Sequence, residues 1–305
     1  MIYTLTTNPA IDLNIESDKI NPSIVNRTKS TKYSENGKGI NVSKILKHYG
    51  IDSKVLGFFG GFSGKFIISQ LNDQEIENDP VMVKEPTRIN IFINDGKNEY
   101  KIVNKGSFVG KGKQKELYEK LENMNDCDYL VISGSLPNGI KKDIYYKILD
   151  ICNKKSIKVI MDISSKILKD LLSYKPLLIK PNDEEINKIF GFKTESKEEI
   201  INALEKIHEL GAQNILLTMG EKGLYFYNGD KILFCDTPRI NLRSSACSGD
   251  ASLGAFLSEW LFKNDLNLAL KKSSAVGANV AESEGLGELK KVNNYISEVK
   301  IEEVK

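Results

Sequence analysis

Cysteine and histidine are scarce in this chain of 305 residues, and their scarcity excludes several kinds of site. The four cysteines are Cys127, Cys152, Cys235 and Cys247. They stand singly, without the short spacing that a zinc site or a redox dithiol requires, so we predict four reduced thiols. The two histidines, His48 and His208, both lie within amphipathic helical patterns. A histidine-rich metal centre is therefore excluded.

Long apolar runs and a surplus of charge of one sign are also absent. Lysine and arginine number 43 against 41 aspartates and glutamates, so no global field favours nucleic acid or an anionic membrane. No apolar run is long enough to span a bilayer, and the first nine residues lack the basic and apolar regions of a signal peptide. We predict a cytoplasmic protein without a nucleic-acid or membrane partner. Any anion-binding site must come from local geometry.

What the chain has is a regular alternation of helix and strand patterns from about residue 111 onward. Helices are predicted at 117–124, 144–152, 167–172 and 200–210, and strands at 129–133, 158–162, 177–180 and 214–218. Two more helices are predicted at 249–262 and 266–280. Because crossovers between parallel strands are right-handed, this order predicts an α/β fold with helices on both faces of a mostly parallel sheet.

The first third of the chain contains a different pattern. Residues 12–16 alternate in polarity, and the β-rich segments 88–94 and 99–103 flank a glycine-containing turn, which predicts an antiparallel hairpin. We expect strands from about 12–17 and 88–103 to form a small separate sheet that covers the main body as a lid. Since the chain has no internal repeat or linker, residues 1–305 are predicted to form one domain with this appendage.

Residues 244–257 are the most informative segment, because a run of small residues precedes a predicted helix. Small residues let several backbone N–H groups converge at the helix N-terminus, where the positive end of the dipole favours a phosphate. Asp250 lies in the first turn of this helix. An isolated Asp there is best interpreted as a partner of the helix dipole. However, residues 36–41 also open a helix after a glycine-rich turn that fits neither a P-loop nor a dinucleotide fingerprint.

Ordered motifs along nearly the whole length make the chain similar to the ribokinase-type (pfkB) carbohydrate kinases. Within that family it resembles the branch of 1-phosphofructokinases and tagatose-6-phosphate kinases. The matching segments are residues 8–12, 25–27, 37–42, 57–64, 87–90, 133–137, 180–185 and 247–250. The resemblance implies a ribokinase-like three-layer α/β/α sandwich with a small β-sheet lid, and a homodimer formed through the lid. It also implies ATP-dependent phosphorylation of fructose 1-phosphate to fructose 1,6-bisphosphate.

The resemblance further implies roles for individual residues. Asp250 matches the catalytic base, and Cys247, Ser248 and Gly249 match the anion hole that surrounds it. Binding of the acceptor sugar phosphate is expected from Asp12, Arg27, Gly37, Lys38, Asn41 and Arg88. ATP binding is expected from Lys180, Asn182, Thr218, Gly220, Gly249, Gly277 and Asn279. Asn182 and Glu185 match the motif associated with Mg²⁺, so ATP and Mg²⁺ are the implied cofactors.

Two positions depart from the family pattern. Cys247 stands at the first glycine of the anion hole, and Asn36 stands at a glycine that precedes the Lys-Gly pair. Two alternatives stay open: a tagatose-6-phosphate kinase, which shares the motifs, and a sugar-phosphate sensor without turnover. Because a pure sensor needs neither base nor metal motif, Asp250 and Glu185 argue against the second alternative.

Overall fold

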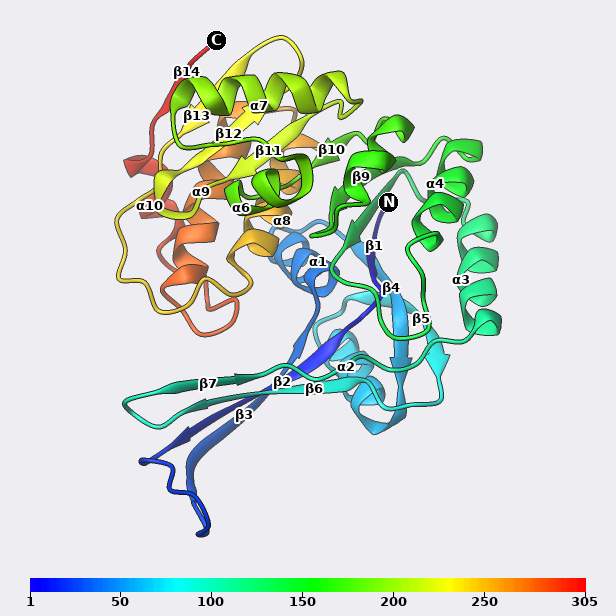
Figure 1. The fold of residues 1–305 in the computed structure, drawn as a ribbon, viewed down its shortest axis with the longest axis vertical. Coiled ribbons are helices and arrows are strands. Elements are labelled where there is room, and N and C mark those ends of the chain that lie inside the picture. Colours follow the sequence, from blue (N-terminus) through cyan, green and yellow to red (C-terminus); the bar gives the residue numbers. More distant parts are fainter.

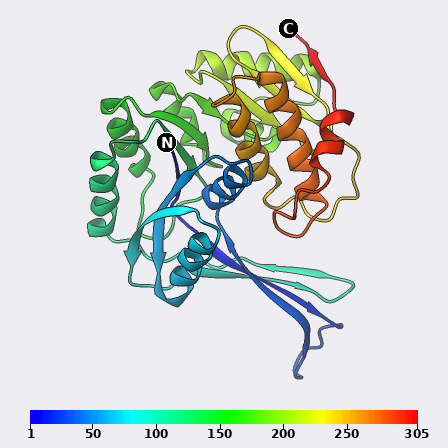
Figure 2. The same ribbon diagram turned by 180° about the vertical axis from the view of Figure 1, so that it is seen from behind.

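The computed structural model describes residues 1–305 and arranges them as a large sheet between two layers of helices (Figures 1 and 2). The sheet has ten strands in the order β14-β13-β12-β11-β10-β9-β8-β1-β4-β5. The strands are β1 (Ile2–Thr6), β4 (Ser53–Gly60), β5 (Glu77–Val83), β8 (Tyr129–Ser133), β9 (Lys158–Asp162), β10 (Leu178–Ile179), β11 (Ile215–Thr218), β12 (Leu224–Tyr227), β13 (Ile232–Cys235) and β14 (Ile301–Glu303). Pairing is parallel from β5 to β11 and antiparallel from β11 to β14. The predicted α/β class is confirmed.

Helices cover both faces of this sheet. One layer contains α1 (Lys38–His48), α2 (Gly61–Asp73), α8 (Ser248–Trp260), α9 (Leu266–Ala281) and α10 (Val292–Glu298). The other contains α3 (Lys111–Asn123), α4 (Ile144–Lys154), α5 (Leu168–Leu171) and α7 (Lys197–Glu209). The short helix α6 (Asp183–Glu185) lies at an end of the sheet. None of the helices combines the length and the apolar character needed to cross a membrane.

The strands of the sheet centre are buried on both faces, as their continuous apolar runs require. All five residues of β1 are buried. On one face Leu5 joins a cluster of 40 buried residues with α3, α4 and α7. On the other face Ile2 packs with Val42 of α1 and Leu253 of α8 in a second cluster of 17 buried residues. Each face of the sheet therefore has its own apolar core.

Four further strands form a second sheet that projects from the main body (Figure 1). Its order is β3 (Thr28–Asn36), β2 (Ala10–Ser17), β6 (Arg88–Asn94) and β7 (Glu99–Ile102). The β2 and β6 strands pair in parallel, and β6 and β7 form the antiparallel hairpin that the sequence predicts. The β3 strand was not predicted. Most of its residues are polar and exposed on both faces, so it has no alternating pattern to detect.

The connection of β1 to its two neighbours creates a crevice in the large sheet. β1 lies between β4 and β8, and the chain winds through β4 and β5 on one side before it continues from β8 to β11 on the other. Such a switch in strand order leaves an opening beyond the carboxyl ends of the strands, where α/β proteins bind ligands. Thr6, Ser133 and Asp162 end three of these strands.

Candidate active site

A cavity of about 450 Å³ opens at the switch point. The second sheet contributes Ala10, Asn36, Arg88 and Asn90 to its lining, the start of α1 contributes Gly37 and Lys38, and the approach to α8 contributes Ala246, Cys247 and Asp250. Of the residues that the sequence predicts for the site, the cavity gathers Gly37, Lys38, Arg88, Cys247 and Asp250. These residues come from distant parts of the sequence.

The start of α1 is held tightly against the end of β1. Thr6 Oγ1 accepts a hydrogen bond of 3.1 Å from the backbone N–H of Ile40, which supplies a partner for one free donor at the helix N-terminus. A Cβ on Gly39 would lie 2.5 Å from Thr6 Oγ1, so only glycine permits this close approach. The contact places Lys38 and Asn41 beside the crevice.

Asp250 lies in the first turn of α8 and is 7% exposed. Its Oδ2 accepts a hydrogen bond of 2.9 Å from Nδ2 of Asn41, which ties α8 to α1. Burial, and then the nearby charge of Asp162, raise the pKa of Asp250 to about 6. The backbone N–H groups of Gly249 and Asp250 make no hydrogen bond within the chain. The helix start therefore offers a proton acceptor beside free donors, which suits an anion that reacts with a hydroxyl.

Asp162 lies between two lysines below this helix start. It is fully buried at the end of β9, and its Oδ1 is 3.2 Å from Nζ of both Lys38 and Lys180. Burial opposes ionisation of Asp162, but the charges of Lys180 and Lys38 outweigh it and lower the pKa. A Cβ on Gly249 would lie 3.3 Å from Lys180 Nζ, so this lysine reaches the N-terminus of α8. The carboxylate thus holds two cations at the place where a phosphate would bind.

Asp12 and Arg88 come from the second sheet. Asp12 accepts a hydrogen bond of 2.8 Å from Asn90 Nδ2 on Oδ1 and another from Asn36 Nδ2 on Oδ2. Burial raises the pKa of Asp12 against the opposing effect of these donors and of Arg88. Arg88 donates to the carbonyl oxygens of Asn8 at 3.1 Å and Asn104 at 3.3 Å, whereas its buried Nε has no partner. The cavity is therefore lined by a guanidinium that two backbone carbonyl oxygens hold in place.

Arg27 lies outside the cavity. It occupies the turn between β2 and β3, where its carbonyl oxygen accepts a hydrogen bond of 3.3 Å from Ser17. Ser17 is seven residues beyond Ala10, which lines the cavity, so a strand rise of about 3.3 Å per residue puts Arg27 roughly 23 Å away. Within one chain, Arg27 cannot join Arg88.

The residues that the sequence predicts to bind the nucleotide come from the ends of β10 and β11 and from α9. Thr218 ends β11 and bridges to Asn182 through the backbone, and Gly220 begins the next turn. Gly277 of α9 faces α8, because a Cβ there would lie 3.6 Å from the carbonyl oxygen of Ser248. Asn279 has a different role in the structure. Its side chain accepts from the Lys291 N–H at 3.0 Å and donates to Ser283 at 3.3 Å, so it holds the loop before α10.

Asn182 and Glu185 form a capping box at α6. Asn182 Oδ1 accepts from the Glu185 N–H at 2.7 Å, and Glu185 Oε2 accepts from the Asn182 N–H at 3.0 Å. The structure contains no cluster of three or more His, Cys, Asp or Glu side chains suited to a metal ion. Mg²⁺ fits here only as an ion held mainly by phosphates and water. Glu185 could contribute to holding such an ion, because its carboxylate lies near the cavity. Its charge adds to the larger effects of Asp162 and Asp250, which together raise the pKa of Lys38 despite burial.

Several lining residues were not assigned a role from the sequence. They include Asn8, Asn90, Ser135, Lys142 and Ser164. The buried Asp162, which lies beneath the cavity and pairs with Lys38, was not assigned a role either. Asp162 could have been found, because it ends a predicted strand next to the strand that leads to Lys180. Lys142 lies in the loop before α4, where nothing in the sequence marks it.

Comparisons with known proteins find relatives that match nearly the whole length of the chain. The family model described as pfkB family carbohydrate kinase matches residues 5–292. The chain is 46% identical over 301 residues to a D-tagatose-1-phosphate kinase of Klebsiella oxytoca, and the match covers 99% of each protein. It is 33% identical over 302 residues to a 1-phosphofructokinase of Bacillus subtilis, again with 99% of each covered. The solved structure of a putative phosphofructokinase from Staphylococcus aureus has a TM-score of 0.90 and 30% identity, and the match covers 100% of this chain and 99% of that one.

Proposed function

The chain belongs to the pfkB family of carbohydrate kinases and is a sugar-phosphate kinase, and from this premise we propose that it transfers a phosphoryl group from ATP to the terminal hydroxyl of a ketohexose 1-phosphate. D-tagatose 1-phosphate is the first candidate, supported by 46% identity to an enzyme named for that substrate. Fructose 1-phosphate, which the motifs imply, is the second, supported by 33% identity. Tagatose 6-phosphate is not proposed, since both relatives are named for ketoses that carry phosphate on C1.

The observation that carries the proposal is a buried carboxylate with a raised pKa at a helix N-terminus that faces a cavity. Asp250 takes the proton from the terminal hydroxyl of the sugar as that oxygen attacks the γ-phosphorus of ATP. A pKa of about 6 leaves Asp250 ionised at neutral pH, yet more basic than an ordinary carboxylate. Asn41 holds the carboxylate by one oxygen, so the other is free to accept the proton.

The charge that develops on the transferred phosphoryl group meets groups already in place. The free N–H donors of Gly249 and Asp250 and the ammonium of Lys180 lie where the γ-phosphate would bind. Mg²⁺, held near Glu185 through water, would supply further positive charge to the phosphates of ATP. Because these groups do not need to move, they stabilise the transition state without reorganisation.

The acceptor is oriented by the second sheet. Asp12 accepts hydrogen bonds from sugar hydroxyls, and the guanidinium of Arg88, which lines the cavity, binds the phosphate already on the sugar. The acceptor then lies between β2, β6 and α8, with its far end at Asp250. This arrangement accounts for a cavity lined by polar groups at both ends.

We also propose that the second sheet forms a homodimer. Register places Leu13, Tyr33, Ile91 and Ile102 in one row across its four strands, on the face opposite Asp12 and Asn90. Tyr33 is 54% exposed and Ile102 is 49% exposed. Because Arg27 lies outside the cavity of its own chain, its predicted role in phosphate binding requires that it act in the cavity of such a second copy.

The proposed function is tested by measuring ADP release with four acceptors: D-tagatose 1-phosphate, fructose 1-phosphate, tagatose 6-phosphate and fructose 6-phosphate. We expect the highest kcat/KM with D-tagatose 1-phosphate, followed by fructose 1-phosphate. The proposal would be refuted if neither C1 phosphate raised the rate of ADP release above the rate with ATP alone. A preference for either C6 phosphate would move the acceptor to another class.

A further inference from the structure

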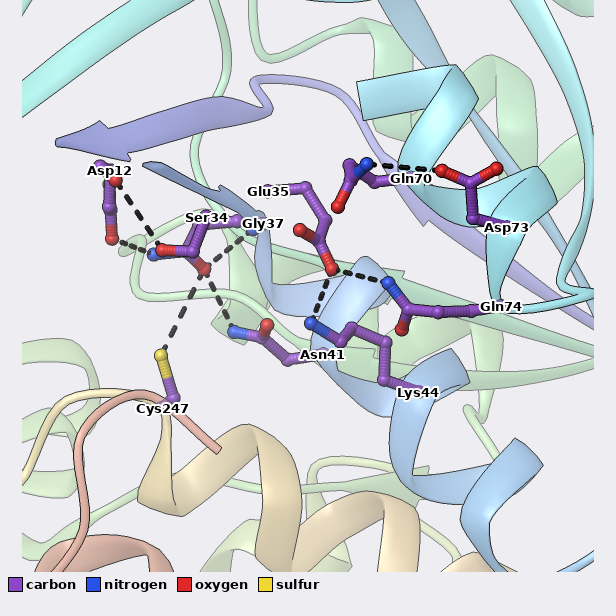
Figure 3. Close-up of polar contacts among 11 residues, drawn as sticks. Asp12, Ser34, Glu35, Gly37, Asn41, Lys44, Gln70, Asp73, Gln74 and Cys247 are labelled. Atoms are coloured by element: carbon purple, nitrogen blue, oxygen red, sulfur yellow. Dashed lines mark hydrogen bonds and ion pairs between the residues drawn. The ribbon is translucent and has the colours of Figure 1, made fainter. Parts of the chain in front are cut away.

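Asn36 and Cys247 are the two residues that replace family glycines, and they contact each other in the cavity wall. Asn36 ends β3, and Cys247 immediately precedes α8. The Cys247 Sγ lies 3.9 Å from Oδ1 of Asn36. In Figure 3 this contact is the dashed line that leaves the Cys247 sulfur. Two departures from one pattern, separated by 211 positions, therefore meet at a single point.

The carboxamide of Asn36 has only one compatible orientation. Its Oδ1 accepts from the Gly37 N–H at 2.6 Å and from Asn41 Nδ2 at 2.9 Å, while its Nδ2 donates to Asp12 Oδ2. A backbone N–H can only donate and an ionised carboxylate can only accept, so a flipped amide would lose both contacts. Figure 3 shows Asp12, Gly37, Asn41 and Cys247 converging in this way.

These contacts link the two functional carboxylates. Asn41 donates to Asn36 Oδ1 and, through the same nitrogen, to Asp250 Oδ2 at 2.9 Å. An unbroken chain of hydrogen bonds thus runs from Asp12 through Asn36 and Asn41 to Asp250. With glycine at position 36, Asp12 would keep only its bond from Asn90, and Asn41 would lose one of its two partners.

The thiol of Cys247 supports this arrangement from the α8 side. Burial raises the pKa of Cys247 to about 12, so the sulfur stays protonated and can donate weakly to Asn36. The residue has φ 63°, a left-handed conformation that few residues other than glycine favour. Cys247 is thus held in a strained conformation and contributes a contact that glycine could not make.

We propose that Asn36 is a positioning residue that fixes Asp12 relative to Asp250, with Cys247 as its support, and thereby sets the preference between ketohexose 1-phosphates. The inference rests on the proposed function, in which Asp12 binds sugar hydroxyls. Tagatose and fructose differ in the configuration of one hydroxyl, so discrimination requires an acceptor whose lone pairs have fixed directions. Asn90 and Asn36 hold one oxygen of Asp12 each, which fixes the carboxylate plane.

The test compares Asn36→Ala, Asn36→Asp and the control Ser34→Ala. Asp is nearly isosteric with Asn and keeps acceptors for Gly37 and Asn41, but it removes the donor to Asp12. The Asn36→Asp variant therefore still tests the proposal if the Ala variant fails to fold. Ser34 lies two positions before Asn36 and contacts only the backbone oxygen of Asp12, at 3.4 Å. For each protein, kcat and KM are measured with D-tagatose 1-phosphate, fructose 1-phosphate and ATP across pH 5–9.

Both Asn36 variants should change the ratio of kcat/KM for the two sugars by about tenfold or more, with the KM for ATP within twofold of the unchanged protein. Asn36→Asp should also make the sugar KM rise as pH rises, because two ionised carboxylates then face each other. Ser34→Ala should leave the ratio within twofold. An Asn36 variant that lowers both rates equally, with the ratio unchanged, would overturn the proposal and reduce Asn36 to a structural residue.

The role of Cys247 is tested with a double-mutant cycle of Asn36→Ala and Cys247→Gly. We expect Cys247→Gly to shift the sugar ratio in the same direction by a few-fold, and to add nothing in the Asn36→Ala background. Additive effects would overturn the supporting role. If the unchanged protein turns over neither sugar, the proposed function itself fails. If it turns over a sugar and the ratio survives in both Asn36 variants, only the present inference fails.

Discussion

Asp250 is an ionisable group kept in an environment that disfavours its charge. Lys38 and Lys180 favour the ionised form, and Asn41 donates to it, but burial and the charge of Asp162 dominate. The same surroundings that make the carboxylate basic also oppose its ionisation in the folded protein. Catalysis and stability are therefore linked at this residue.

Replacing Asp250 with Asn tests the role of the carboxylate. The amide keeps an oxygen for Asn41 but cannot accept the proton, so kcat should fall about 10²–10⁴-fold, with little change in either KM. Steady-state kinetics would measure this. Asp170→Asn is the control, since Asp170 is an exposed acid in the first turn of α5. Near-normal turnover in Asp250→Asn would show that another group is the base.

The pH dependence follows from the same shift. Because Asp250 must be ionised to act, kcat should decline as pH falls through about 6. The folded state binds this proton more tightly than the unfolded chain, so stability is lost as pH rises from about 4 to 6. Asp250→Asn should therefore raise the free energy of unfolding at pH 8, by at most about 3 kcal/mol, and by much less at pH 4. Urea unfolding at both pH values checks this, and an equal effect at both would contradict it.

At the scale of elements, two helix starts have the same local chemistry and different surroundings. Both α6 and α7 begin with a capping box, Asn182 with Glu185 and Ser196 with Glu199. The box at α7 is on the surface, whereas Glu185 also accepts a hydrogen bond from Ser164 and influences Lys38 in the cavity. A capping box alone therefore does not distinguish a structural helix start from one at a functional site.

The paired variants Glu185→Ala and Glu199→Ala separate these roles. Each should cost about 1 kcal/mol of stability, because each removes one half of a capping box. Only Glu185→Ala should raise the Mg²⁺ concentration that gives half-maximal rate, by several-fold. Thermal unfolding and a Mg²⁺ titration of activity are the measurements. Equal Mg²⁺ requirements in the two variants would confine Glu185 to capping.

How far the sequence predicts these elements depends on what buries them. The strands 129–133 and 158–162 were predicted with the observed bounds, because buried parallel strands are continuous apolar runs. The edge strand β5 contains Pro80 and begins with polar residues, and β3 is exposed on both faces, so neither has such a signal. In the candidate site, the family motifs in the sequence predicted Asp250 and Arg88 as site residues, and both line the cavity. The hydrogen bonds of Asn36 depend on tertiary packing, which no local pattern encodes.

At the scale of the whole molecule, the second sheet leaves an apolar face without a partner in a single chain. Tyr33, Ile102 and Tyr100 are exposed there, at 54%, 49% and 40%. A row of this kind across four strands is unusual on a free surface and is typical of an interface. In the function and the homodimer that we propose, the two faces of the sheet have different tasks, one toward the sugar and one toward a second copy.

Ile102→Asp tests the interface, with Phe262→Asp as a control. The two residues are 49% and 48% exposed, and Phe262 lies after α8, away from the second sheet. Burial of a charge in the interface should make Ile102→Asp monomeric at micromolar concentration, while Phe262→Asp should keep the mass of the unchanged protein. Light scattering after gel filtration measures the mass. A dimer that persists in Ile102→Asp, or a monomeric unchanged protein, would exclude this interface.

The lysines and carboxylates near the start of α8 nearly balance each other in charge. Lys38 and Lys180 share Asp162, and Asp250 and Glu185 add two further carboxylates, so this end of the cavity has no surplus of positive charge. A triphosphate that enters it finds oriented donors but no net counter-charge. For the proposed reaction we therefore expect the nucleotide to arrive already neutralised by its own cation. Such a site would distinguish a metal-complexed nucleotide from the free anion by charge balance, before any step of the reaction begins.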